Sequence, residues 1–184
     1  MAVTLRHASP ATIVKLVSDG EVDFGVTTNR DVVEDDLVIL PSHKFERIVI
    51  VPRGHELECR RKISLKLLST FPLIAYDEGF SGRMEIMKAF QRAKLNPRIA
   101  LTASDADVIK SCVEQGLGIA VVLNVVFNPE RDKGIVAIPA SSLFPQAQTS
   151  VVLRRRHHFR KCDYEFVEML SPRWHRSNIQ RASI

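Results

Sequence analysis

The chain has 184 residues, 45% of them hydrophobic, and carries a formal net charge of +5 at pH 7. A chain of this length and composition can bury a globular core, either as one domain or as two small lobes. It contains no run of about 18 apolar residues and no signal-peptide pattern at its start, so the sequence predicts neither a transmembrane helix nor secretion. We therefore expect a cytoplasmic protein with no membrane partner.

The three cysteines argue against covalent or metal cross-links. Cys59, Cys112 and Cys162 are odd in number and widely separated, with no Cys-x-x-Cys spacing, which is unlike a disulfide framework or a structural zinc site. His157 and His158 precede Cys162 by about one helical turn, but the surrounding arginines would repel a cation. The sequence therefore predicts no metal site.

The predicted elements begin with a short helix. Ser9 is a favourable N-cap, Pro10 fits the first helical turn, and Gly20 suits the C-terminal end. A strand over residues 22–27 follows at once. Apolar runs predict seven further strands, over residues 37–40, 47–51, 72–76, 98–103, 118–123, 135–138 and 150–154.

Helical patterns lie between several of these strands. A short helix near residue 63 has Ser64 as its expected cap, and a longer helix covers residues 83–94. The next helix begins at Ser104, in a capping-box-like sequence, and ends at Gly116. These helices alternate with the strands along the chain, which is typical of an α/β fold.

The sequence predicts a largely parallel sheet, because the run over residues 119–123 is continuously apolar. No helix is predicted at residues 41–46 or 139–149, so we expect the chain to cross between two lobes at both places. The first lobe then comprises residues 1–43 and 145–184, and the second comprises residues 44–144.

The excess positive charge lies at the C-terminal end. From residue 153 onward the chain has eight Lys and Arg against three acidic residues. Such a run is typical of nucleic-acid contact or of a solvated helix face, and the absence of interleaved aromatics favours the solvated face. A helix is predicted over residues 158–170. Its sheet-facing positions are Phe159, Cys162, Phe166 and Leu170.

The turn at residues 79–83 is the strongest candidate for a binding site. Ser81 lies between two glycines where a strand gives way to a helix, and Gly82 and Arg83 follow it. A hydroxyl and unpaired N–H groups at the positive end of a helix dipole favour a small anion. Two alternatives stay open: Ser81 is an ordinary N-cap, and Arg83 pairs with neighbouring glutamates instead of with a ligand.

Further hydroxyls follow other strand ends, where ligands of open α/β sheets bind. Thr27 and Thr28 come after the first full strand, and Thr102 and Ser104 come at a later one. Their ordinary roles are strand formation for the threonines and capping for Ser104. The expected ligand is small, polar and anionic, and the site requires Thr28 and Ser81 to converge.

Motifs that would indicate an enzyme are absent. The sequence has no Gly-x-Ser-x-Gly elbow, no Walker loop and no Gly-x-Gly-x-x-Gly. Asp105 and Asp107 complement a helix dipole more simply than they form an acid pair. We expect no catalysis, and an anion-processing enzyme is the weaker alternative.

Several segments together resemble the effector-binding domain of LysR-type transcriptional regulators. The resemblance is strongest to the CysB and Cbl branch, which controls sulfur assimilation, and it covers about residues 3–170. The Phe-Ser-Gly-Arg sequence ending at Arg83 and the Asp-Ala-Asp-Val-Ile-Lys sequence ending at Lys110 are its most specific elements. The segments that carry it are residues 21–26, 36–41, 79–83, 102–110 and 116–119.

The resemblance implies two α/β lobes of the type II periplasmic-binding-protein kind. It implies a small anionic effector in the interlobe cleft, either sulfate or an acetylserine-type inducer, with no other cofactor. Thr28 matches a cleft threonine of the family, and Ser81 replaces a threonine while keeping its hydroxyl. A homo-oligomer, dimer or tetramer, is expected. The remaining expected site residues are Gly82, Thr27, Arg83 and Thr102.

The resemblance also implies segments before Met1. Members of the family begin with a helix-turn-helix, a linker helix and a first strand, so we expect an N-terminally truncated effector domain that reaches DNA only through a helix-turn-helix absent from this chain. The alternative is a truncated remnant that senses nothing and acts as a dimerisation or interaction module.

Overall fold

The structure is a computed structural model that describes residues 3–28, 35–155, 160–171 and 173–182. None of the helices in these ranges has the length and hydropathy to cross a bilayer. The helices are α1 (Pro10–Ser18), α2 (Leu65–Leu68), α3 (Ser81–Arg92), α4 (Ala106–Glu114), α5 (Lys161–Leu170) and α6 (Arg176–Ala182), with 3-10 turns η1 (Glu56–Cys59) and η2 (Asn124–Val126). The strands are β1 (Phe24–Thr27), β2 (Leu37–Phe45), β3 (Arg47–Pro52), β4 (Leu73–Tyr76), β5 (Ile99–Ala103), β6 (Ile119–Leu123), β7 (Ile135–Pro139) and β8 (Ala147–Arg154).

The chain divides into two compact units. The first consists of Met1–Lys44 and Gln148–Ile184, and the second consists of Phe45–Ala147. The sequence predicts these unit boundaries between residues 43 and 44 and between residues 144 and 145. Each unit has its own sheet, with three strands in the first and five in the second.

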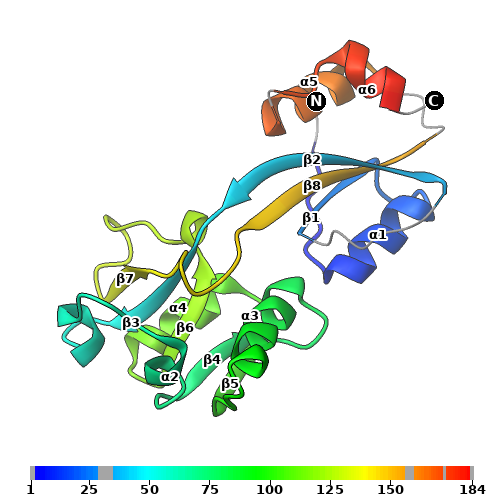
Figure 1. Cartoon of the computed structure of the whole chain (residues 1–184). Coiled ribbons are helices and arrows are strands. Elements are labelled where there is room, and N and C mark those ends of the chain that lie inside the picture. The colour runs from blue at the N-terminus through cyan, green and yellow to red at the C-terminus, as the bar shows by residue number, and fades with distance from the viewer. Residues whose placement is uncertain (1–2, 29–34, 156–159, 172, 183–184) are drawn as a thin grey trace. The chain divides into compact units, whose positions relative to one another are not determined.

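The sheet of the first unit has the order β1-β8-β2. β1 is antiparallel to β8, with Gly25 opposite Val152. The Arg155 amide donates to the Asp36 carbonyl at 2.7 Å and the His43 amide donates to the Thr149 hydroxyl at 3.2 Å, which makes β2 antiparallel to β8 as well. Figure 1 shows α1 against one face of this sheet and α5 and α6 against the other.

The first helix begins and ends as the sequence predicts. Ser9 caps α1 by accepting from the Thr12 amide, Pro10 is its first residue, and Gly20 has a φ of 76° just beyond it. The helix packs so closely on β1 that a Cβ at Gly25 would lie 2.4 Å from Ile13. Only glycine fits that position of the strand.

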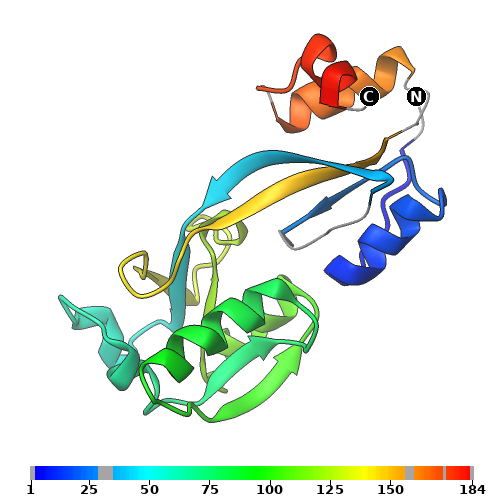
Figure 2. The ribbon, with the colours of Figure 1, turned by 45° about the vertical axis from the view of Figure 1, so that its right-hand side comes forward.

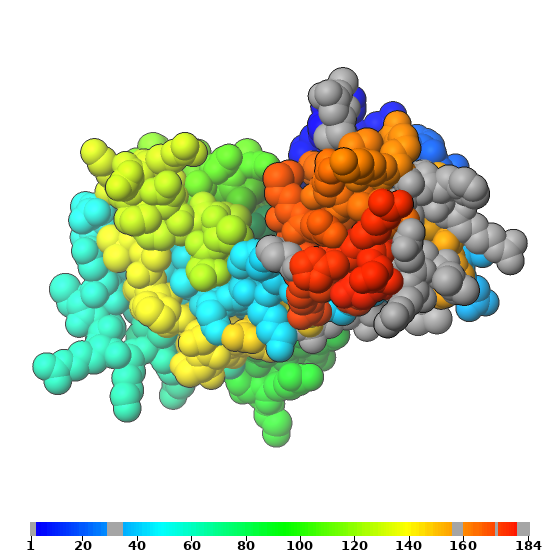
Figure 3. All heavy atoms as spheres, turned by 90° about the horizontal axis from the view of Figure 1, so that it is seen from above, coloured from blue at the N-terminus to red at the C-terminus, as the bar shows by residue number. Residues whose placement is uncertain are grey.

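The C-terminal helices pack on the opposite face of the same sheet. Tyr164 and Ile179 are buried with Leu153, and Figure 3 shows α5 in orange beside α6 in red. Arg173 Nε and Trp174 Nε1 both donate to the Pro41 carbonyl, at 2.8 and 2.7 Å. Arg176 lies over the ring of Tyr164. Part of the C-terminal positive charge therefore fastens these helices to β2, which favours a structural role over nucleic-acid contact.

The helix predicted over residues 158–170 corresponds to α5, and a further helix, α6, follows it. α5 begins at Lys161, with Arg160 as its N-cap and with Asp163, 4% exposed, completing a capping box. The predicted start at residue 158 and the predicted contact of Phe159 lie outside the described residues.

The sheet of the second unit has the order β5-β4-β6-β3-β7. β4 is parallel to β5 and β6, whereas β3 is antiparallel to β6 and β7. The prediction of a largely parallel sheet is therefore wrong. A continuous apolar run indicates that both faces of a strand are buried, but it does not give the direction of the neighbouring strands. β6 is buried between helices, and it is parallel to β4 but antiparallel to β3.

Helices cover both faces of this second sheet. Val49 and Phe90 pack in the cluster on the α3 side, which Figure 2 shows in front of the strands, and Ile50 and Ile109 pack in the cluster on the α4 side. Successive residues of β3 point to opposite faces, so its side chains alternate between the two clusters. Arg47 has the same parity as Val49 and therefore belongs to the α3 side.

Candidate functional site

One edge of the second sheet collects the candidate groups. The carboxyl ends of β4, β5 and β6 lie at this edge, and the antiparallel β3 begins there, with Arg47 opposite Leu123. α3 starts a few residues after Tyr76, the last residue of β4, and α4 starts after β5. Two helix N-termini and the first residue of β3 therefore share the edge at which ligands of α/β sheets bind.

The N-terminus of α3 lacks a side-chain cap. The N-cap residue is Phe80, which forms no capping hydrogen bond, and Ser81 is the first helical residue. The helix thus starts two residues before the predicted range, and Ser81 is not the N-cap. The first helical bond runs from Met84 to the Phe80 carbonyl, and no described residue accepts from the Gly82 or Arg83 amide. Two amides at the positive end of the helix are left to bind something else.

Arg83 is held against the end of β4. Its Nη1 donates to the Tyr76 carbonyl at 3.0 Å, and its Nη2 lies 3.5 Å from the Glu78 carboxylate. The side chain is 18% exposed and the carboxylate 91% exposed, so the ion pair is weak and the carbonyl contact fixes the guanidinium. Arg83 thus joins the first turn of α3 to the strand, and its contact with an anion stays a prediction.

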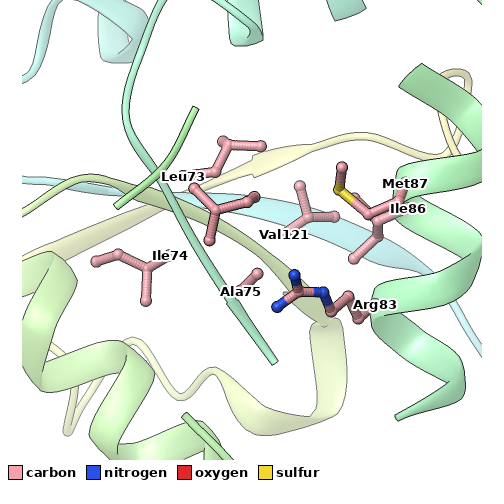
Figure 4. Close-up of a pocket in the computed structure, with 8 residues that line it drawn as sticks. Leu73, Ile74, Ala75, Arg83, Ile86, Met87 and Val121 are labelled. Atoms are coloured by element: carbon pink, nitrogen blue, oxygen red, sulfur yellow. The ribbon is translucent and has the colours of Figure 1, made fainter. Parts of the chain in front are cut away.

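A small hollow lies beside α3, with a volume of about 270 Å³ that includes the open space at its mouth. Figure 4 shows Arg83 reaching from α3 over Ala75 at this hollow. Apart from Arg83, its lining is apolar and does not suit an oxyanion. The lining residues are Leu73, Ile74, Ala75, Arg83, Ile86, Met87, Ile99 and Val121.

Arg47 is a buried cation close to the first turn of α3, and the sequence analysis did not predict it there. It is 4% exposed, its Nε donates to the Pro145 carbonyl at 3.1 Å, and its Nη1 lies 3.8 Å from the point that a Cβ at Gly82 would occupy. Burial lowers the pKa of Arg47, and the charge of Glu85 opposes that shift. The sequence does contain one indication of this position. Arg47 lies two residues before Val49 in an apolar strand, so the alternation of the strand puts its cationic side chain on a buried face.

Tyr76 forms an aromatic wall at the same place. Its ring stacks on Phe80 with centroids 5.8 Å apart, and its Cδ2 is also 3.8 Å from the Gly82 point. Burial raises the pKa of Tyr76, the charge of Asp105 raises it further, and the charge of Arg47 opposes both. The phenol therefore stays neutral at physiological pH and adds no negative charge.

The N-terminus of α4 is capped, in contrast to that of α3. Asp105 is its N-cap, and Oδ1 accepts from the Asp107 and Val108 amides at 2.7 and 3.4 Å. The predicted cap Ser104 is exposed, because the neighbouring carboxylate makes the stronger, charge-assisted cap. Thr102 is exposed on β5. A carboxylate already occupies this helix end, so it disfavours a second anion.

Lys110 ties α4 to the loop before β7. Its Nζ lies 2.9 Å from Asp107 and 3.1 Å from Asp132, and it donates to the Val126 carbonyl at 3.0 Å. Burial works against the charged amine, but its hydrogen bonds to Asp107 and Asp132 outweigh burial and raise the pKa of Lys110. The Asp-Ala-Asp-Val-Ile-Lys sequence is therefore explained by a cap and an ion-pair cluster.

Thr27 and Thr28 belong to the first unit. Thr27 ends β1, is 3% exposed and lies opposite Ser150, whereas Thr28 is half-buried. The structure brings Ser81, Gly82 and Arg83 together in the second unit with Arg47. The convergence of Thr28 on the same anion stays a prediction.

No group of three or more His, Cys, Asp or Glu side chains that suits a metal ion occurs in the part of the chain that the structure describes. His157 and His158 lie outside that part. The thiols of Cys59, Cys112 and Cys162 are free.

Comparison with known proteins identifies the family. The LysR substrate binding domain matches residues 1–174. The chain belongs to this family. The HTH-type transcriptional regulator SsuR of Burkholderia cenocepacia is 38% identical over 177 residues, which is 96% of this chain and 58% of SsuR. CysB of Haemophilus influenzae is 34% identical over 99% of this chain and 56% of CysB. The LysR domain described here thus spans somewhat more than half of these relatives.

Solved structures show the same fold. The cofactor-binding domain of the Cbl transcriptional regulator superimposes with a TM-score of 0.87 at 29% identity, over 95% of this chain and 76% of that one. The effector-binding domain of QuiR superimposes with a TM-score of 0.77 at 15% identity, over 90% of this chain and 78% of that one. The predicted fold class, an α/β LysR effector domain related to type II periplasmic binding proteins, is confirmed.

Proposed function

We propose that this chain is the effector-sensing domain of a CysB-like regulator of sulfur assimilation, and that it binds a small anion such as sulfate or an acetylserine-type inducer. Similarity to SsuR, CysB and Cbl supports the regulatory role. The observation that carries anion binding is the uncapped start of α3, where the Gly82 and Arg83 amides have no acceptor among the described residues.

A small oxyanion suits this helix end for electrostatic reasons. The aligned peptide dipoles place about half a positive charge there, and unpaired amides donate directly to anion oxygens. Ser81, half-buried in the first turn, adds a hydroxyl to the same end, and Thr28 is proposed as a further donor. Recognition of this kind needs no nucleophile or general base, and the proposed protein catalyses no reaction.

The proposal extends to the whole regulator. The protein that contains this domain is proposed to act in the cytoplasm as a homo-oligomer, and to contact DNA through a helix-turn-helix rather than through this domain. Effector binding in the domain then regulates transcription of sulfur-assimilation genes.

Isothermal titration tests the proposed ligand class. Sulfate, thiosulfate and O-acetylserine are each titrated into the protein, and at least one is expected to give saturable binding that weakens in Ser81→Ala. Ser111→Ala is the matched control, because Ser111 is an exposed helical serine whose hydroxyl donates to the Asp107 carbonyl within α4. Equal affinity in Ser81→Ala and the wild type would contradict the site. Absence of binding by all three ligands would favour a non-sensing interaction module.

A further inference from the structure

Arg47 is a charged residue in an otherwise apolar strand. It is 4% exposed, and the next four residues of β3, Ile48–Val51, are buried. No described carboxylate forms an ion pair with it. Glu85 acts on Arg47 only through space, and its carboxylate lies 3.2 Å from Lys88 instead. Burying a cation without a paired anion costs stability, so a structural role alone explains Arg47 poorly.

One nitrogen of the Arg47 guanidinium has a hydrogen-bond acceptor, and the other two have none among the described residues. Nε donates to the Pro145 carbonyl, and no described residue accepts from Nη1 or Nη2. Nη1 lies 3.8 Å from the position of a Cβ at Gly82, and the Gly82 and Arg83 amides also have no described acceptor. A cationic donor from β3 therefore lies close to the first turn of α3, and neither it nor the Gly82 and Arg83 amides have a described acceptor.

We infer that Arg47 binds the anionic group of the effector, an oxyanion with at least two acceptor oxygens that bridges the guanidinium and the first-turn amides of α3. This inference rests on the proposed function and adds the formal positive charge that hydroxyls and amides lack. An ionised donor strengthens each hydrogen bond to an oxyanion, and the planar fork of Arg favours sulfate, sulfonate and carboxylate groups.

The inference separates binding from stability. A buried cation that waits for a ligand destabilises the unliganded protein, so Arg47→Met should leave the melting temperature unchanged or raise it while it removes anion binding. An arginine that only supports the fold predicts the opposite result, a lower melting temperature with anion binding retained.

The experiment compares the wild type, Arg47→Met and Arg53→Met, with sodium sulfate as the probe. Arg53 is the matched control, because its Nε also donates to a backbone carbonyl, that of Lys133 at 2.8 Å, from an exposed side chain just after the end of β3. Calorimetry measures affinity, and thermal denaturation at constant ionic strength measures stability. We expect at least tenfold weaker sulfate binding in Arg47→Met and wild-type binding in Arg53→Met.

The outcomes distinguish the two proposals. Equal sulfate affinity in Arg47→Met and the wild type overturns the role of Arg47 and leaves the proposed function standing. A wild type that binds none of sulfate, thiosulfate and O-acetylserine overturns both. If Arg47→Met does not fold, Arg47→Lys replaces it, because Lys keeps the charge but loses the planar fork. At least threefold weaker binding in Arg47→Lys then supports the inference, and unchanged binding overturns it.

Discussion

The two helices α3 and α4 begin at the same edge of one sheet and end up with opposite electrostatics. α4 carries a carboxylate cap, since Asp105 accepts from two first-turn amides. α3 has no side-chain cap, and the buried cation Arg47 lies beside its first turn. The positive end of α4 is therefore neutralised by the carboxylate of its own N-cap residue, whereas the positive end of α3 still attracts an anion. This difference, rather than the presence of a helix N-terminus, is the reason that the anion site is proposed at α3.

The largest expected effect is on the α4 side. Lys110→Met leaves the carboxylate of Asp132, 13% exposed, without its cation and should destabilise the protein by about 3 kcal/mol, because an uncompensated buried charge is costly. Urea denaturation measures the loss. Lys88→Met is the control, since its pair with Glu85 is exposed and should contribute less than about 1 kcal/mol. Equal losses in the two variants would refute the structural role of Lys110.

The second effect compares the two helix starts directly. Asp105→Ala removes a cap and should cost about 1 kcal/mol, whereas Ser81→Ala removes none and should cost less than about 0.5 kcal/mol. Both losses are read from the urea midpoint. A Ser81→Ala loss as large as that of Asp105→Ala would show that the starts of α3 and α4 do not differ in the way described.

The third prediction makes α3 resemble α4. Ser81→Asp places a carboxylate at the positive end of α3 near Arg47, and should stabilise the protein by about 0.5–1 kcal/mol while it blocks sulfate. Thermal denaturation with and without sulfate reads both effects. Ser81→Asn is the uncharged control. Sulfate stabilisation that persists in Ser81→Asp would contradict the location of the site.

The smallest effect is a pH dependence confined to α4. Burial opposes ionisation of Asp132, but hydrogen bonds from the Asn128 amide and from Lys110 outweigh it and lower the pKa of Asp132. A lowered pKa in the folded state contributes stability that is present above the unfolded pKa of about 3.9 and is lost as pH falls through the folded value. The stability difference between the wild type and Asp132→Asn should therefore be constant from about pH 5 to about pH 7, and should shrink on further acidification. A difference that grows in acid would contradict the assigned ion pair.

Most strand positions follow from the sequence because apolar runs mark segments buried on both faces. β6 is an example: its predicted and observed ranges, 118–123 and Ile119–Leu123, differ by one residue. The direction of neighbouring strands does not follow from such runs, and so the antiparallel β3 was missed. The sequence does not fix where a helix starts. Ser104 and Asp105 are both favourable N-caps, and which of them caps α4 depends on which side chain reaches the first-turn amides.

The sequence predicts one part of the candidate site, the turn before α3, but not the contribution of Arg47. The glycine-flanked Ser81 indicates the turn, but Arg47 lies far earlier in the chain. It comes close to Gly82 only because β3 runs antiparallel to β6. A single Arg in an apolar strand is also typical of a solvated strand end. Its burial and its open guanidinium edge become visible only once α3 and the loop at Pro145 are packed around it.

The most direct test of the account is an NMR titration of the wild-type protein with sulfate. The account predicts saturable chemical-shift changes at the Gly82 and Arg83 amides, while the Asp107 and Val108 amides, already bonded to Asp105, stay unchanged. Saturable shifts at the start of α4 with none at the start of α3 would contradict it.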